Sequence, residues 1–127
     1  MKVLSLEQMH QLKELGVAVK PKGMCLMYTS DSSDNYYLKY GESTCEDDVA
    51  AFSLQNLIEL LPKQLPQDDF GYNCLLITPN VGLTGYVFHY KDNADGEIYK
   101  RIYSEDILQA AYGMLIWVIE NGYLKTK

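Results

Sequence analysis

The closing segment of the chain, Ser104–Gly122, restricts the possible folds more than any other segment because it reads as one long helix. Glu105 and Asp106 stand in its first turn, where the helix dipole favours acidic side chains, and Gly122 marks its end. Its apolar positions extend well beyond the roughly 100° stripe that is typical of a surface helix. We therefore expect the rest of the protein to wrap this helix and a partner to cover what remains.

The border of this helix carries the side chains that we expect to form an interface. Aromatic residues at the rim of a buried stripe often anchor protein contacts. The candidate interface residues are Tyr112, Ile116, Trp117 and Tyr123. They predict self-association of the protein as a homodimer. In the alternative interpretation, Trp117 covers one end of its own core.

Two shorter helices are predicted upstream. Residues Ser5–Leu15 repeat apolar side chains at every third position, with the first serine as N-cap and Gly16 as a stop. Residues Ser53–Leu61 carry a full apolar stripe behind their first serine. Pro62 ends this helix because the residue before a proline is pushed out of helical geometry.

The remaining periodic segments predict an antiparallel sheet of about five strands, because their connections are too short for parallel crossovers. Residues 41–48 and 64–71 read as loops. The strand segments are Met24–Thr29, Tyr36–Tyr40, Tyr72–Thr78, Thr84–Lys91 and Glu97–Tyr103. We predict a single α+β domain over residues 1–127, with three helices mainly on one face of the sheet and the order α-β-β-α-β-β-β-α.

The register of the last two strands depends on their connection. If Asp95 and Gly96 form a tight turn, Tyr90 faces Arg101. One face of the sheet then carries a run of aromatic side chains, namely Tyr86, Phe88, Tyr90, Tyr99 and Tyr103. A longer connection shifts this register and turns the third strand over.

The charge balance disfavours direct contact with nucleic acid. The protein has seventeen acidic and eleven basic residues and a formal net charge of −6. A nucleic-acid backbone is normally bound by a basic surface, and the basic residues are scattered here. The eleven tyrosines could stack bases only beside a positive groove, so we expect them in the sheet core or at a protein-facing surface.

Cysteine usage and hydropathy indicate a cytoplasmic protein. The three cysteines are an odd number without a paired spacing, which favours free thiols in a reducing compartment. The N-terminal residues lack the apolar core of a signal peptide. The longest apolar run, Met114–Ile119, is far shorter than the roughly 20 residues that a membrane span needs.

The segment Asp92–Glu97 resembles part of a calcium loop, but that reading fails because Lys91 and Ile102 would occupy ligand positions. A hairpin turn is the favoured interpretation. Gly82 and Gly85 lack the lysine and the following helix of a phosphate-binding loop. We expect no metal and no cofactor.

Catalytic groups are also not predicted, although two constellations stay open. Cys74 and His89 stand on neighbouring predicted strands and could meet as a nucleophile and base. The paired acids Asp47-Asp48 and Asp68-Asp69 could converge across a cleft, but loop solvation is their usual role. A small enzyme is therefore the least favoured hypothesis.

Three helical stretches carry a resemblance to a known family. They are Leu6–Val17, Phe52–Pro62 and Ala110–Leu124. Together they resemble a family of small uncharacterised proteins from phage and prophage regions of gut bacteria. The family has no assigned activity, so the resemblance implies a phage-linked setting and no site residue.

The preferred hypothesis is a non-enzymatic accessory protein that acts by contact with itself or with a host or phage protein. An alternative is an acidic inhibitor that imitates DNA and binds a basic host protein. The acidic residues that could form such a surface are Asp31, Asp34, Glu42, Glu46, Asp47, Asp48, Asp68 and Asp69.

Overall fold

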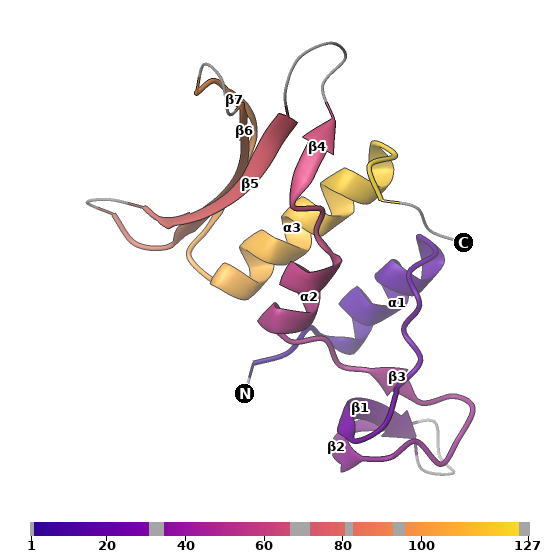
Figure 1. Ribbon diagram of the computed structural model, residues 1–127. Helices are drawn as coiled ribbons and strands as arrows, with labels where there is room; N and C mark the ends of the chain where they lie inside the picture. Colours follow the sequence, from indigo (N-terminus) through magenta and orange to yellow (C-terminus); the bar gives the residue numbers. More distant parts are fainter. Residues whose placement is uncertain (1, 31–34, 67–71, 81–82, 93–95, 125–127) are drawn as a thin grey trace. The chain divides into compact units, whose positions relative to one another are not determined.

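A computed structural model of the protein describes residues 2–30, 35–66, 72–80, 83–92 and 96–124 (Figure 1). Its contacts divide into two units, Met1–Ser53 and Leu54–Lys125, which we call the N-terminal and the C-terminal unit. Among the described residues there are three helices and seven strands, and every strand pairing is antiparallel. The predicted α+β class is therefore confirmed, while the single domain stays a prediction.

The N-terminal unit begins with helix α1 (Leu6–Glu14), which is capped as the sequence predicts. The Ser5 hydroxyl accepts a hydrogen bond of 3.2 Å from the backbone N–H of Gln8. The Gln8 side chain accepts one of 3.1 Å from the backbone N–H of Ser5. Gly16 follows the helix in the left-handed region, at φ 94°, so the predicted stop is confirmed.

The sheet of the N-terminal unit contains one strand that the sequence did not predict. Strands β1 (Cys25–Ser30) and β2 (Tyr36–Gly41) form the predicted hairpin. The two-residue strand β3 (Val49–Ala50) adds to the other side of β1, giving the order β2-β1-β3. Two residues are too short for an alternating pattern, and only their pairing with β1 makes them a strand.

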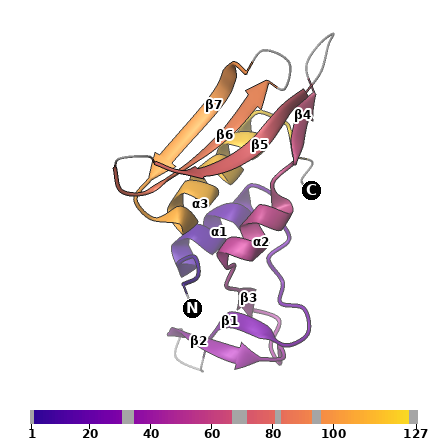
Figure 2. The ribbon, with the colours of Figure 1, turned by 60° about the vertical axis from the view of Figure 1, so that its left-hand side comes forward.

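The C-terminal unit contains helix α2 (Leu54–Leu60) and a sheet with the order β4-β5-β6-β7 (Figure 2). Its strands are β4 (Gln64–Pro66), β5 (Tyr72–Pro79), β6 (Tyr86–Asp92) and β7 (Ile98–Ser104). The single sheet of about five strands is thus wrong: the strands form two sheets. Strand β4 lies in the segment predicted as a loop, because pairing with β5 organises three residues that have no strand pattern of their own.

Of the two registers considered for β6 and β7, the one that depends on a tight turn is wrong, and the shifted one of a longer connection is confirmed. Tyr90 pairs with Lys100, and Phe88 pairs with Ile102, with an irregularity between Tyr90 and Lys91. The connection is longer than a two-residue turn, since the Asp92 N–H donates to the Glu97 carbonyl. A shift of one residue moves every side chain to the other face, so the expected aromatic face is not formed.

Helix α3 (Ile107–Glu120) begins three residues later than predicted. Ser104 is still the last residue of β7, and the Asp106 carboxylate caps the helix by accepting a 2.9 Å hydrogen bond from the Leu108 N–H. Gly122, at φ 77°, ends the helix as predicted. Of the helices in the described ranges, none is both long and apolar enough to cross a membrane.

Candidate functional site

One face of the β5–β7 sheet packs against α3, and the register fixes which residues lie there. Tyr90 and Lys100 both contact the Trp117 ring. A Cβ added to Gly113 would lie 3.2 Å from the side chain of Ile102, which shows how closely the helix approaches β7. We call this the inner face and the opposite side the outer face.

The outer face carries two rows of side chains that run across the three strands. One row consists of Leu76, His89 and Arg101, which are aligned by pairing. The second row consists of Thr78, Val87 and Tyr103. Side chains that are paired in this way have Cβ atoms about 5 Å apart. The two rows therefore form one continuous surface.

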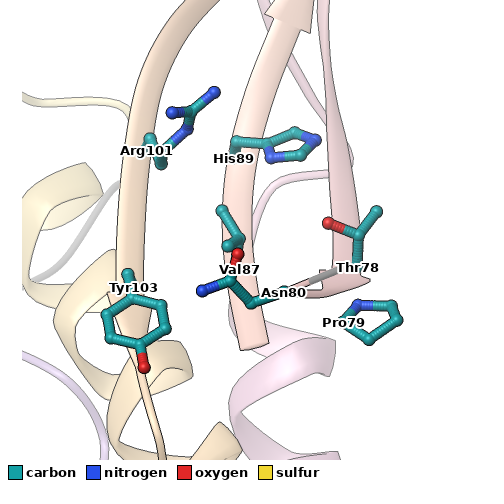
Figure 3. Close-up of a pocket in the computed structure, with 7 residues that line it drawn as sticks. All are labelled: Thr78, Pro79, Asn80, Val87, His89, Arg101 and Tyr103. Atoms are coloured by element: carbon teal, nitrogen blue, oxygen red, sulfur yellow. The ribbon is translucent and has the colours of Figure 1, made fainter. Parts of the chain in front are cut away.

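This surface is hollowed to a volume of about 360 Å³, which we call the outer-face hollow (Figure 3). Its lining residues are Thr78, Pro79, Asn80, Val87, His89, Arg101 and Tyr103. The volume is near the lower limit of typical ligand sites, roughly 300–1,000 Å³. The hollow is thus large enough for one or two residue-sized groups.

The two ends of the hollow differ in chemistry. Figure 3 shows Arg101 and His89 at one end, and Tyr103, Asn80 and Pro79 at the other. Val87 lies between them and is buried although it is on the outer face. The hollow therefore joins a cationic end to one that has both apolar and uncharged polar groups.

Backbone groups of Thr84 and Ser104 bound the end of the hollow that holds Tyr103. The Tyr103 hydroxyl donates a 2.8 Å hydrogen bond to the Thr84 carbonyl. The next residue, Gly85, has φ +95°, and a Cβ there would lie 2.6 Å from the Ser104 carbonyl oxygen. Only glycine fits this position, so the Tyr103 ring is held against a rigid backbone.

His89 has a ring nitrogen without a hydrogen-bond partner in the described part of the chain. Its Nδ1 atom is buried and has no hydrogen-bond partner among the described residues. Burial lowers the pKa of its imidazole below the usual 6.5, and the charges of Arg101 and Lys91 lower it further. The imidazole is therefore neutral at pH 7, with one nitrogen as a donor and the other as an acceptor.

Arg101 supplies the full positive charge at this end. Its side chain is exposed. None of the described residues forms a hydrogen bond or an ion pair with the guanidinium group. The charges felt by His89, from Arg101 and Lys91, are both positive. In an acidic protein, this part of the outer face is locally cationic.

The predicted interface residues lie on or just after α3, and all of them are half-buried, namely Tyr112, Ile116, Trp117 and Tyr123. The Trp117 ring lies 5.4 Å from the Tyr123 ring and 6.0 Å from the Tyr99 ring, measured between centroids. The Tyr99 and Tyr123 hydroxyl groups are 2.9 Å apart. These contacts lie within the C-terminal unit, and the interface role stays a prediction.

Cys74 and His89 share the outer face, but they are not opposite one another. Cys74 pairs with Lys91, and His89 pairs with Leu76, so the two are diagonal neighbours. Nδ1 of His89 lacks a hydrogen-bond partner among the described residues, so no third group there orients the imidazole through this atom as a base for the thiol. All three cysteines are free. In the described ranges no three His, Cys, Asp or Glu side chains gather in a metal-binding group.

The paired acids Asp47 and Asp48 do not act together. Asp47 is exposed, whereas Asp48 is buried, with 4% of its surface exposed. Asp48 therefore cannot contribute to an acidic surface that imitates DNA. Of the other acids in that prediction, Glu42 and Glu46 are exposed. Asp31, Asp34, Asp68 and Asp69 lie outside the described residues, as do Asn93 to Asp95 of the calcium-like segment.

Asp48 instead forms hydrogen bonds with the loop that precedes it in the sequence. Its Oδ2 atom accepts hydrogen bonds from the Ser43 hydroxyl at 2.9 Å and from the Thr44 N–H at 3.1 Å. The pKa of the Asp48 carboxyl group is lowered, and the nearby Thr29 hydroxyl is the largest cause. Burial acts in the opposite direction and raises this pKa. Oδ1 makes no hydrogen bond of good geometry, so Thr29 acts on it as a neighbouring dipole.

The sequence did not predict the outer-face hollow. His89 was expected at a sheet face, which is correct, whereas Arg101 was expected opposite Tyr90 only if a tight turn joined the two strands. Comparison with known proteins adds no family: no family model, curated protein or solved structure matches the sequence. The function must therefore be argued from the site itself.

Proposed function

We propose that the protein is a non-enzymatic accessory protein that acts by protein–protein contact through the outer face of β5–β7. The observation that carries this proposal is the exposed apolar surface around the hollow. Leu76 is 40% exposed and lies in the row of His89 and Arg101, and Tyr103 is 47% exposed at the other end of the hollow. Aromatic and aliphatic side chains next to an arginine are typical of protein interfaces.

A binding role fits this surface better than catalysis does. A nucleophilic pair needs a base that a third group orients. Among the described residues, no group forms a hydrogen bond with Nδ1 of His89 to orient it. The Tyr103 hydroxyl is committed to the Thr84 carbonyl. The hollow therefore offers recognition groups and no activated nucleophile.

The partner at this face is a protein other than a second copy bound through the same face. A twofold contact centred on the cationic end would place Arg101 and Lys91 opposite the same residues of the other copy. Like charges brought together at an interface cost several kcal/mol, of the order that decides partner choice. The resemblance of the helical segments to phage-associated proteins supports placing this contact in the cytoplasm of a bacterial cell.

A photo-crosslinking experiment tests the proposal. A photoreactive phenylalanine analogue replaces Leu76 in the full-length protein, which is expressed in a bacterial host. The matched control carries the same analogue at Glu59, an exposed residue of α2. We expect a discrete heterologous product only from position 76. The same products from both positions, or none from position 76, would contradict the proposal.

Self-association as a homodimer is a second proposal, and an apolar strip on β2 favours it. Leu38 is 44% exposed and Tyr40 is 64% exposed, and they lie on one face opposite Tyr28 and Leu26. Since β2 is at the edge of its sheet, two copies could pair there about a twofold axis. Sedimentation over a range of concentrations should show a dimer that Tyr40→Glu disrupts, and a concentration-independent monomer would contradict it.

A further inference from the structure

The outer-face hollow offers a more specific prediction than contact alone. Its cationic end combines an arginine without a partner and a histidine nitrogen without a partner among the described residues. The Arg101 side chain is exposed, whereas the Nδ1 atom of His89 is buried. The guanidinium group is thus open to an incoming anion, and the His89 ring lies beside it.

The geometry selects the kind of anion. The planar guanidinium fork matches a carboxylate in a bidentate arrangement. Of the residues that line the hollow, Arg101 carries the full positive charge, with a neutral imidazole beside it, which fits a monoanion better than a doubly charged phosphate. Glu105 accepts a hydrogen bond of 3.3 Å from the Thr84 side chain at the Tyr103 end, so negative charge is already present there. An anion therefore belongs at the Arg101 end.

We propose that the outer-face hollow binds a carboxylate of the protein partner, with Arg101 as its ion-pair donor and His89 as a hydrogen-bonding neighbour. The apolar side chain next to that carboxylate lies on Val87 and Tyr103. This inference rests on the proposed function and names the chemistry of the partner. The carboxylate can come from the carboxyl terminus of the partner or from one of its acidic side chains, since both present the same group.

Small probes test the chemistry without the partner. Nuclear magnetic resonance of the labelled full-length protein follows titrations with N-acetyl-phenylalanine, which has a terminal carboxylate, and with N-acetyl-glutamyl-phenylalaninamide, which has a side-chain carboxylate. The neutral control is N-acetyl-phenylalaninamide. From its number of atoms, such a probe should bind with a dissociation constant of about 1 mM. We expect shifts at His89 and Val87, and binding at least about tenfold weaker for the neutral probe.

Two variants of equal charge separate the site from a general charge effect. Arg101→Gln should abolish the preference for a carboxylate. Lys100→Gln, one residue away on the inner face, should leave it unchanged. Thermal unfolding of both variants establishes that they are folded. The stronger of the two carboxylate probes identifies whether a terminal or a side-chain carboxylate is preferred.

Several results would overturn the inference. Equal binding of the acid and amide probes, carboxylate binding retained by Arg101→Gln, no binding of any probe, or inorganic phosphate bound more tightly than either carboxylate would each do so. If Arg101→Gln leaves crosslinking from position 76 unchanged, the inference of a bound carboxylate is contradicted, but the proposed protein contact still stands. If the probes bind but no crosslinked product forms, the proposed function is contradicted and the anion site still stands.

Discussion

The hydroxyl of Tyr90 donates a 2.8 Å hydrogen bond to the carbonyl oxygen of Pro62, which follows α2. Tyr90 is fully buried, so this bond joins the centre of the sheet to the segment that leads into β4. Tyr90→Phe should lower the free energy of unfolding by about 1–2 kcal/mol because the carbonyl loses its donor. Urea denaturation measures the change. Tyr103→Phe removes a bond of the same length at an exposed position and should cost clearly less.

Alkaline pH should act on the same residue. Burial raises the pKa of the Tyr90 hydroxyl well above its usual 10.0. The unfolded protein therefore loses this proton first, and the stabilisation is lost as the pH rises above about 10. Wild type should lose stability above pH 10 more steeply than Tyr90→Phe does. Parallel pH curves for the two proteins would contradict this reasoning.

Substitution by alanine should destabilise the protein far more at Gly85 than at Gly113. A Cβ at Gly85 would lie 2.8 Å from Glu105 Cα as well as 2.6 Å from the Ser104 carbonyl oxygen, and φ is positive. We expect Gly85→Ala to cost about 2–4 kcal/mol. At Gly113 the added atom would meet the Cγ2 methyl group of Ile102 at 3.2 Å. The gain in helix propensity offsets that contact, so a change within about 1 kcal/mol is expected in thermal unfolding.

Asp48 should make the protein sensitive to acid. Its pKa is lowered in the folded protein, so the unfolded protein binds more protons and the stabilisation is lost as pH falls below the usual 3.8. Asp48→Asn should cost about 1 kcal/mol at pH 7 through weaker hydrogen bonds to the 43–45 turn. Urea denaturation should show that difference shrinking by pH 3. Asp47→Asn, at the exposed neighbour, should have little effect, and a difference that grows in acid would argue against this role of Asp48.

The pKa of His89 should depend on the charge of Arg101. Burial is the largest cause of its low value, followed by Arg101 and then Lys91. Arg101→Gln should therefore raise the pKa only part of the way toward 6.5, and Lys91→Gln by a smaller amount. A titration of the imidazole resonances by nuclear magnetic resonance measures both shifts. A carboxylate bound in the outer-face hollow should raise the value further, since it favours the charged imidazole.

Replacement of Trp117 should lower the stability of the protein without changing its association state. Its ring contacts Tyr99 and Tyr123 and lies 5.6 Å below the Lys100 amino group, all within the C-terminal unit. Trp117→Ala should cost about 2–3 kcal/mol in urea denaturation, below the range for a fully buried ring. The sedimentation coefficient should stay unchanged. A changed association state with little loss of stability would instead support the interface predicted at this residue.

The helix ends were predictable because their signals are local. Ser5 and Gln8 stand three residues apart and form a capping box. Gly16 and Gly122 supply the left-handed conformation within one turn of the helices that they end. The start of α3 shows the limit of such signals: Ser104 and Asp106 are both good caps, and pairing of Ser104 with Tyr86 in the sheet decided between them.

The short strands and the outer-face hollow were not predictable in this way. Strand β4 exists only because Leu65 pairs with Asn73, and its own sequence reads as a loop. Arg101 joins His89 only because the β6–β7 connection is longer than a tight turn. One residue of register decides which face a side chain occupies, and no nearby residue encodes that choice.

The sequence by itself determined the three helices, two of their stops and the antiparallel α+β class, because apolar periodicity and capping act over a few neighbouring residues. Only the tertiary structure decided that there are two sheets, that Asp48 is buried in its own loop, and that Arg101 lies beside His89 on the outer face. Each of these depends on backbone hydrogen bonds or packing between segments distant in the sequence, where a slip of one position exchanges the two faces of a strand.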